Sequence, residues 1–265
     1  MNIFKIIINI IKHYKMIFKL AKNDFKSKYA NSFLGVIWAF IQPMITILVF
    51  WFVFQVGFKT PPVNDIPYIL WFIPAYIPWI YFTEILNSTA NSMLEYNYLV
   101  KKVKFDVEII PSVKIISAAF VHIFFIGFIF FMYWILQRQI TVYCLQAVYY
   151  SVALTVLGFG IGMLVSSVTV LFKDFAQIVN VILQIGFWAS PIYWNPDNME
   201  GWVISILKLN PVYYIISGYR GAFVNQDVFW NHPAQTLYFW TFAIVICITG
   251  CKLFVALRPF FADEL

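Results

Sequence analysis

Residues 142–168 read VYCLQAVYYSVALTVLGFGIGMLVSSV, and none of these 27 residues is charged. A helix needs about 20 apolar residues to cross the hydrocarbon core of a bilayer, so this run is long enough to span a membrane. The rest of the chain has the same character, since 62% of its 265 residues are hydrophobic and only 11% are charged. Soluble domains are about 25% charged. The sequence therefore predicts an integral membrane protein.

The apolar runs predict helices rather than the strands of a membrane barrel. They are continuous, whereas barrel strands alternate apolar and polar residues over about ten positions. Six long runs are present, near residues 33–57, 67–93, 109–136, 142–168, 175–194 and 234–257. We therefore expect an all-α integral membrane protein in which residues 32–265 form one domain with six transmembrane helices. Pro67, Pro74 and Pro78 predict kinks in the second span.

Lysine and arginine are distributed unevenly between the two sides of this topology. If the N-terminus is inside, fourteen of the eighteen Lys and Arg residues fall in inside segments. Cytoplasmic loops of membrane proteins have this excess of positive charge. We therefore expect both termini in the cytoplasm.

Residues 3–26 have the pattern of one amphipathic helix within a cytoplasmic interfacial segment, residues 1–31. At about 100° per residue, six lysines share a third of the circle. Bulky apolar residues occupy the opposite arc, where Asp24 is an exception. This pattern is typical of a helix lying flat on an anionic membrane surface. The alternative, a first span interrupted by lysines, would place six charges in the bilayer. The lysines are Lys5, Lys12, Lys15, Lys19, Lys22 and Lys26, and the apolar arc holds Ile3, Ile7, Ile10, Tyr14, Ile17, Ala21 and Phe25.

The segment 195–233 lies outside on this topology, yet it is too apolar for an ordinary loop. Its apolar stretches, 201–209 and 212–223, flank Asn210-Pro211 and are each too short to span a membrane. We expect a re-entrant helical hairpin over residues 196–226 that dips into the outer leaflet. A pair of helices lying on the surface is the alternative.

The stretch 97–114, NYLVKKVKFDVEIIPSVK, is a charged island between two apolar runs. If residues 98–108 form a short helix, Leu99, Val103 and Val107 share a stripe that can rest on the membrane domain. An aromatic residue among charges on the other side favours the docking of a partner protein. Lysines that only set topology and contact lipid headgroups are an equal alternative. The outer side would hold Lys101, Lys102, Lys104, Phe105 and Glu108.

No catalytic motif is evident, and we expect neither a catalytic residue nor a metal site. The chain lacks a GxxxxGK[ST] phosphate loop, and its three histidines are far apart. Glu84 is the one carboxylate well inside an apolar run. It either faces an internal aqueous cavity or pairs with a lysine or backbone group. His122, in the third span, is either a hydrogen-bonded packing residue or a proton relay.

Several segments resemble the membrane permease subunit of polysaccharide-exporting ABC transporters, which move lipid-linked O-antigen, teichoic acid and capsule. Residues 24–44, DFKSKYANSFLGVIWAFIQPM, resemble the pattern around the family's first span. Residues 82–111 resemble its run from Phe-x-Glu to Lys-Val-x-Phe and Glu-Ile-x-Pro, although Asp106 stands where the family often has proline. FKDF, SPIYW, NPVYYIISGYRGAF and FFADEL resemble later motifs in the same order. In the first stretch the matching residues are Lys28, Tyr29, Ser32, Leu34, Gly35, Trp38 and Pro43.

The resemblance implies a homodimer that works with two copies of a separate ABC ATPase, which binds ATP and Mg. The complex would export a lipid-linked glycan across a bacterial inner membrane, without nucleic acid and without a cofactor in this chain. Segment 95–109 would be the coupling helix seated on the ATPase, near Lys173 and Asp174, and segment 196–226 an external gate. The first and fifth spans would line the substrate path. Residues expected along this path are Trp38, Glu84, Tyr193, Trp194, Tyr213, Tyr214 and Arg220.

Two other functions stay open on the residues alone. A membrane enzyme acting on lipid-linked sugars requires converging acids or a metal site, which the sequence does not display. An ion-coupled transporter would rest on Glu84 alone, whereas such proteins use a discontinuous-helix ion site or a relay of several groups.

Overall fold

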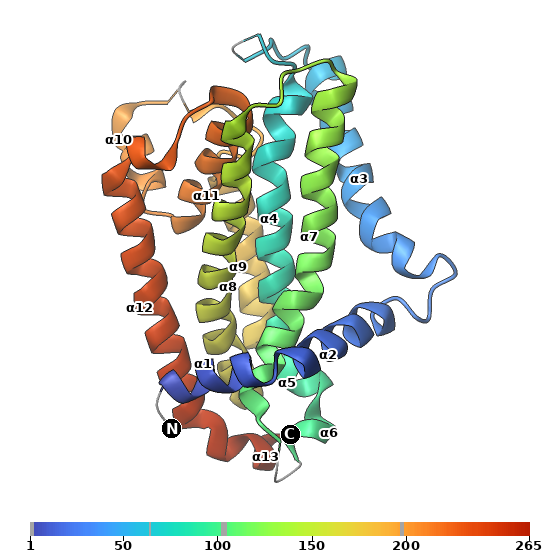
Figure 1. Ribbon diagram of the computed structural model, residues 1–265, viewed down its shortest axis with the longest axis vertical. Helices are drawn as coiled ribbons and strands as arrows, with labels where there is room; N and C mark the ends of the chain where they lie inside the picture. The colour runs from blue at the N-terminus through green and yellow to red at the C-terminus, as the bar shows by residue number, and fades with distance from the viewer. Residues whose placement is uncertain (1–2, 64, 102–104, 197–198) are drawn as a thin grey trace.

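The computed structural model of the chain describes residues 3–63, 65–101, 105–196 and 199–265. These residues form a bundle of helices, and no strand is assigned among them. Long helices run along the bundle axis, and shorter helices cover its two ends (Figure 1). Both termini lie at the same end, which we call the base (Figure 1). The expected all-α class is confirmed.

Five helical segments of the described chain are long and apolar enough to cross a membrane. They match five of the six predicted spans within a few residues. The first joins η1 (Gly35–Ile37), α3 (Trp38–Phe50) and η2 (Trp51–Gly57). The others are α4 (Tyr68–Ala90), η3 with α7 (Val107–Ile109, Ile110–Ile135), η4 with α8 (Val142–Leu145, Gln146–Leu171), and α12 (Pro233–Leu257) continued by η8 (Arg258–Phe260) and α13 (Phe261–Glu264).

The remaining predicted span, the fifth in chain order at residues 175–194, is shorter than expected. The helix α9 covers Phe175–Ala189, and the backbone becomes extended at Ser190. Its 15 residues rise about 22 Å, which is less than the roughly 30 Å of hydrocarbon in a bilayer. Pro191 explains the early end, since the residue before a proline avoids the helical region. The number of six spans therefore stays a prediction.

The central helix is α4, whose span is 83% buried because α7, α8, α9 and α11 pack around it. It continues as one helix through Pro74 and Pro78. The span that contains α3 is the opposite case, with only 11% buried. In Figure 1, α3 diverges from the bundle toward its first residues.

The helices α8 and α12 touch through their backbones. A Cβ atom added at Gly250 would lie 2.2 Å from the carbonyl oxygen of Gly160, and one added at Gly160 would lie 2.7 Å from the backbone nitrogen of Cys247. Small residues allow membrane helices to approach this closely. The packing of this helix pair therefore requires glycine at both positions.

Two helices, α1 (Ile3–Lys12) and α2 (Tyr14–Ser27), cross the bundle near its base, and we call them the belt (Figure 1). We expected one helix over residues 3–26, so the break at His13 is a correction. His13 has φ −99° and ψ 17°. Its ring nitrogen Nδ1 lies 3.0 Å from the Asn9 carbonyl oxygen. The same carbonyl oxygen also accepts from the His13 N–H at 2.9 Å, and a side chain that bonds the carbonyl four residues earlier often bends a helix.

The belt has one basic face and two adjacent apolar stripes. All six lysines of the predicted basic face are exposed. Ile6, Ile17 and Ala21 are fully buried against the bundle. Two residues of the predicted apolar arc, Ile7 and Tyr14, are not covered by the bundle and are 45% and 61% exposed. They belong to a second stripe, available to lipid, made by Ile7, Ile11, Tyr14 and Phe18.

At the end opposite the base, two helices occupy the segment where we expected a hairpin. The helix α10 (Gly201–Leu207) has no buried residue, whereas α11 (Pro211–Arg220) is buried among α4, α8 and α12. Asn210 caps α11 by accepting a hydrogen bond from the Val212 N–H, and Pro211 fits the first turn. The π-helical turn η6 (Gly221–Asn225) follows. The depth of these helices in a membrane stays a prediction.

Substitution of Gly250 by alanine is expected to separate α8 from α12 and to lower stability by about 1–3 kcal/mol, the usual cost of overpacking. Gly127→Ala is the matched control, because a Cβ added at this position in α7 meets no atom within 4 Å. Thermal unfolding of both variants in detergent measures the difference. Equal melting temperatures for Gly250→Ala and Gly127→Ala would contradict the backbone contact.

Candidate functional site

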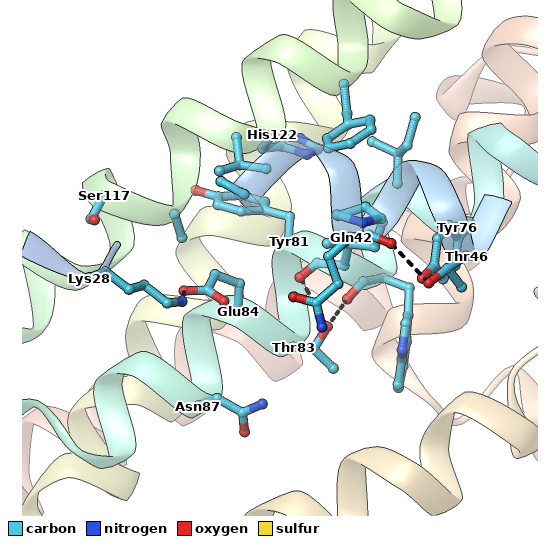
Figure 2. A pocket seen from close by; sticks show the side chains of 18 of the residues that line it. Lys28, Gln42, Thr46, Tyr76, Tyr81, Thr83, Glu84, Asn87, Ser117 and His122 are labelled. Carbon is cyan, nitrogen blue, oxygen red and sulfur yellow. Dashed lines mark hydrogen bonds and ion pairs between the residues drawn. The ribbon is translucent and has the colours of Figure 1, made fainter. Parts of the chain in front are cut away.

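A cavity of about 530 Å³ lies between α3 and the bundle (Figure 2). Its walls come from the end of α2, from α3, α4 and α7, and from Phe187 of α9. We call it the α3 cavity. It exists because α3 packs sparsely against α4, and its lining residues come from the middle of α4 and α7.

An ion pair stands at one end of the α3 cavity (Figure 2). The Lys28 ammonium lies 2.5 Å from Oε1 of Glu84. Burial is the largest influence and lowers the pKa of Lys28, but the charge and hydrogen bond of Glu84, together with Tyr29 and Asp24, outweigh it, so this pKa lies above its ordinary value. Glu84 thus pairs with a lysine and also lines an internal cavity, which combines the two alternatives set by the sequence. The pair joins two segments that separately resembled the permease family.

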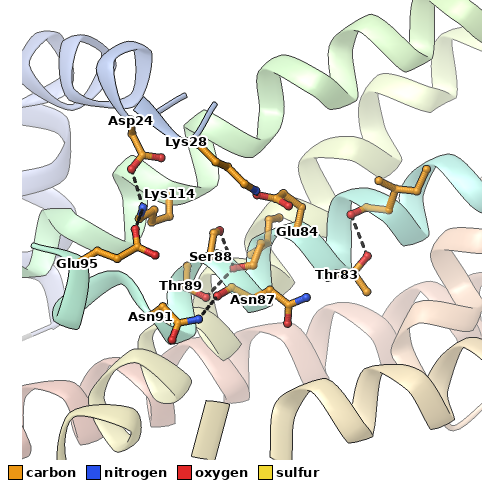
Figure 3. Close-up of polar contacts among 12 residues, drawn as sticks. Asp24, Lys28, Thr83, Glu84, Asn87, Ser88, Thr89, Asn91, Glu95 and Lys114 are labelled. Atoms are coloured by element: carbon orange, nitrogen blue, oxygen red, sulfur yellow. Dashed lines mark hydrogen bonds and ion pairs between the residues drawn. The ribbon is translucent and has the colours of Figure 1, made fainter. Parts of the chain in front are cut away.

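Polar residues that follow Glu84 on α4 mostly bond to their own helix (Figure 3). Ser88 and Thr89 donate to the Ile85 carbonyl, and Asn91 donates to the Asn87 carbonyl. These side chains therefore do not join α4 to its neighbours. Asn87 differs from the others because it also lines the α3 cavity.

Four aromatic rings form the other end of the α3 cavity. Phe50, Tyr76, Trp79 and Phe187 all line it. Phe187 contacts the other three, with ring centroids 6.0, 6.3 and 6.1 Å away. The Tyr76 hydroxyl lies beside Thr46 of α3, whose hydroxyl donates to the Gln42 carbonyl at 3.2 Å (Figure 2). The cavity therefore has a polar end and an aromatic end.

His122 lines the α3 cavity from α7 and belongs to a buried polar network. Its Nε2 atom lies 3.1 Å from Ser151 Oγ and 3.0 Å from the Tyr219 hydroxyl. Tyr81 stacks on the imidazole with ring centroids 4.2 Å apart. This network joins α4, α7, α8 and α11. Of the two roles considered for His122, these contacts match a hydrogen-bonded packing residue.

The predicted path residues do not gather in one place. Glu84 lines the α3 cavity. Tyr193 and Trp194 line a second cavity of about 550 Å³, and Tyr213 and Tyr214 line a third of about 310 Å³ with Arg220. Trp38 lines none of the three. The last two cavities adjoin, since both are lined by Val63, Trp71 and Asn195.

Arg220 is held in place at the boundary of these outer cavities. Its guanidinium lies 3.5 Å above the Trp71 ring, and it donates to the Ile192 carbonyl at 2.8 Å. The side chain is only 6% exposed. Arg220 thus fastens α11 to α4 and to the segment that follows α9.

The predicted coupling helix is not continuous. The helices α5 (Ser92–Glu95) and α6 (Asn97–Val100) come first, and η3 begins only at Val107. Phe105 and Asp106 are not helical. Lys102, Val103 and Lys104 lie outside the described residues. Val100 and Val107 are buried on the bundle, as the predicted stripe requires. The expectation of one helix over residues 98–108 was wrong.

Two residues expected on the outer side of this segment pack inward instead. Glu108 is fully buried; its Oε1 accepts a hydrogen bond from Asn9 at 2.9 Å, and its Oε2 lies 3.2 Å from Arg258. Phe105 is half-buried against the belt and the base. The assignment of residues 98–108 to two sides of a helix could not predict these contacts, because the contacting residues are distant in the sequence. Lys101 is exposed, and so are Lys173 and Asp174 in the turn between α8 and α9.

Comparison with known proteins decides the family. Residues 16–224 match the family model described as ABC-2 type transporter. The chain belongs to the ABC-2 type transporter family. It is also similar to the O-antigen export system permease protein RfbA of Klebsiella pneumoniae, with 21% identity over 255 residues and 95% of each chain covered. The RfbA protein of Myxococcus xanthus is 22% identical over 255 residues, which cover 94% of this chain and 95% of the relative.

Membership in the ABC-2 family confirms the resemblance seen in the sequence and favours a transport role over a membrane enzyme. Among the described residues, no group of three His, Cys, Asp or Glu side chains is arranged to hold a metal ion. Charged side chains of this ABC-2 chain instead form ion pairs that join different helices.

A buried ion-pair cluster fastens the belt to the base of the ABC-2 chain (Figure 3). The Lys114 ammonium, on α7, lies 2.5 Å from Asp24 of α2 and also pairs with Glu95 of α5. The Lys114 side chain is 6% exposed and that of Asp24 is 11% exposed. The Tyr96 hydroxyl donates to Asp24 at 2.9 Å, and burial together with this carboxylate raises the pKa of Tyr96.

The sequence contained one signal for this cluster. Asp24 stood out on the apolar face of a basic helix, and a carboxylate there needs a buried cation. Lys114 is one of the fourteen lysines and arginines counted as inside, and nothing else about it was predicted. Nothing in the spacing of residues 24, 95 and 114 indicates that they meet.

Removal of the central cation is expected to destabilise the protein more than removal of an exposed lysine. Lys114→Met leaves the largely buried Asp24 without its cation, and breaking such a pair typically costs about 3–5 kcal/mol. Adding Asp24→Asn to the same chain should recover much of this loss. Lys22→Met, at an exposed lysine of the belt, is the control. Thermal unfolding compares the variants, and no recovery in the double variant would contradict a direct pair.

Proposed function

We propose that this chain is the membrane permease of an ATP-driven exporter of a lipid-linked polysaccharide, of the O-antigen or teichoic acid type. The observation that supports the proposal most strongly is the similarity to O-antigen export permeases over 95% of both chains. Membership in the ABC-2 family agrees with it. The chain provides the path, and ATP and Mg are bound by a separate ATPase subunit.

The ATPase docks at the base in this proposal. Lys101, Lys173 and Asp174 are exposed on two short connections, one after α6 and one between α8 and α9. Both connections are at the end of the bundle where the termini lie (Figure 1). Because Phe105 and Glu108, further along the same connection, contact the belt, movement of a docked ATPase would reach the belt through these contacts.

Orientation in the membrane follows the same proposal. The base faces the cytoplasm of a bacterium, since it holds both termini and the inside segments contain most of the Lys and Arg residues. The basic face of the belt contacts anionic headgroups of the inner membrane, and its second apolar stripe enters the lipid.

Two copies of the chain assemble through α3 and α9. Only 11% of the α3 span is buried, so this helix has few protein neighbours within one chain. On α9, three amide side chains share one face at i, i+3 and i+7 and are exposed. Polar groups within a membrane segment face protein or water rather than lipid. A second copy of the chain, or water in a path between two copies, supplies hydrogen bonds to the side chains of Gln177, Asn180 and Gln184.

Docking is tested by reversing one charge. Lys101→Glu is expected to weaken co-purification with the ATPase roughly tenfold, because a charge at the rim of an interface mainly steers association. Lys59→Glu is the matched control, an exposed lysine at the opposite end. Binding is measured by pull-down at two salt concentrations, together with ATP hydrolysis of the complex. Equal binding by both variants would show that Lys101 is not part of the interface.

Assembly is tested by measuring the mass of the purified complex and by one substitution on α9. The purified complex is expected to contain two permease chains and two ATPase chains, in keeping with the closed symmetry of most oligomers. Asn180→Leu should reduce export if its amide faces a partner or water, whereas Ile182→Leu, also exposed on α9, should not. A single permease chain in an active complex would overturn the proposal. An Asn180→Leu variant that exports normally would show that this face contacts lipid.

A further inference from the structure

Buried apolar side chains at the base form a cluster that is distinct from the core of the bundle. Phe261 of α13 belongs to it; this side chain is 1% exposed, and its ring packs edge to face on Phe254 of α12 at 5.2 Å. The C-terminal turn, residues 258–264, therefore folds back under the base and is part of its packing (Figure 1). The buried members of this base cluster are Ile6, Met93, Val100, Val107, Ile110, Met163, Val170, Cys251, Phe254 and Phe261.

A single carboxylate ties the C-terminal turn to the α6–α7 connection, residues 101–109. Glu108 is fully buried, and Nη1 of Arg258 lies 3.2 Å from its Oε2 atom. No hydrogen bond from the described residues reaches this oxygen. A buried charge requires a compensating charge, and Arg258 provides one from a side chain that is 34% exposed. The burial of Glu108 therefore depends on where Arg258 is held.

The position of Arg258 is set by the helix that precedes it. Arg258 directly follows α12, and α12 is in backbone contact with α8. Taking the cation away from a buried carboxylate is strongly destabilising. If α12 moved away from the α6–α7 connection, Glu108 would lose this cation, so the two are expected to move together. A displacement of the connection would then reach α12 and α8 as a rigid-body shift.

We propose that the C-terminal turn is a transmission element, in which Arg258 acts through Glu108 to couple the α6–α7 connection to the paired helices α8 and α12. The inference rests on the proposed function, since the motion to be carried is that of a docked ATPase. Arg258 is a positioning residue, because it holds the connection in place. This route is separate from the contacts of the connection with the belt.

The attachment is tested on the permease alone, in lipid nanodiscs, by amide hydrogen exchange of residues 105–109. Arg258→Met should speed this exchange about tenfold, because the connection opens more often once Glu108 has lost its cation. In a Glu108→Gln background the same substitution should change the exchange by less than about twofold, since a neutral amide needs no cation. Lys252→Met, which removes an exposed cation of α12, is the control.

Two results of this exchange cycle would overturn the inference. Equal acceleration in both backgrounds would show that Arg258 acts through packing and not through the Glu108 charge. No acceleration in either would show that the turn does not hold the connection. Exchange of residues 69–73, in the buried part of α4, reports whether each variant is folded. If the Arg258→Met chain does not fold, Arg258→Gln takes its place in the same cycle.

Transmission is tested on the complex with the ATPase, with the ATP analogue AMP-PNP and Mg as the probe. In the unsubstituted complex, AMP-PNP should change exchange both at residues 105–109 and at residues 253–257, the end of α12 at the base. In Arg258→Met the change at 105–109 should remain, whereas the change at 253–257 should fall about fivefold or more. A merely structural role would alter exchange before nucleotide is added and leave the response of α12 intact.

An undiminished response of α12 in Arg258→Met would overturn the transmission role, and so would the lack of any response of α12 in the unsubstituted complex. Failure of the proposed function gives a different result. In that case no ATPase co-purifies with the unsubstituted chain, while the exchange cycle on the permease alone still shows whether Arg258 holds Glu108.

Discussion

The arrangement of the base depends on a single buried ammonium group. Lys114 holds Asp24 of the belt and Glu95 of α5, so three segments far apart in the sequence meet at one cation. Because this contact fixes α2, it also fixes the residues that follow α2, and Lys28 is thereby brought to Glu84 at the edge of the α3 cavity. The position of the Lys28–Glu84 pair at the α3 cavity therefore depends on the attachment of the belt.

The belt is attached to the segment after α6 at a second position. Asn9 bonds Glu108, which also lies beside Arg258 of η8. Between the two attachments, Nδ1 of His13 lies 3.8 Å from Asp106. The residues that lead into the third span therefore contact the belt at two positions, through Glu108 and Asp106.

The long helices could be predicted because hydrophobic length is local information, and the limits of α7, α8 and α12 agree with the apolar runs within a few residues. The end of α9 was missed although Pro191 was a visible signal. The inward orientation of Glu108 could not be predicted, since its partners lie 99 and 150 positions away. Glu84 was recognised as unusual, but only tertiary structure shows which lysine it meets. Sequence patterns thus located the unusual charges and left their pairing undetermined.

The glycine contact between α8 and α12 has a consequence for the whole chain. Helices that touch through side chains can slide by exchanging rotamers, but two backbones in contact have no side chain to rearrange at that point. The pair must then shift as one body or come apart. In contrast, α3 has few neighbours to lose when it moves. The two glycines therefore make α8 and α12 one unit, relative to which displacements of the other helices can be measured.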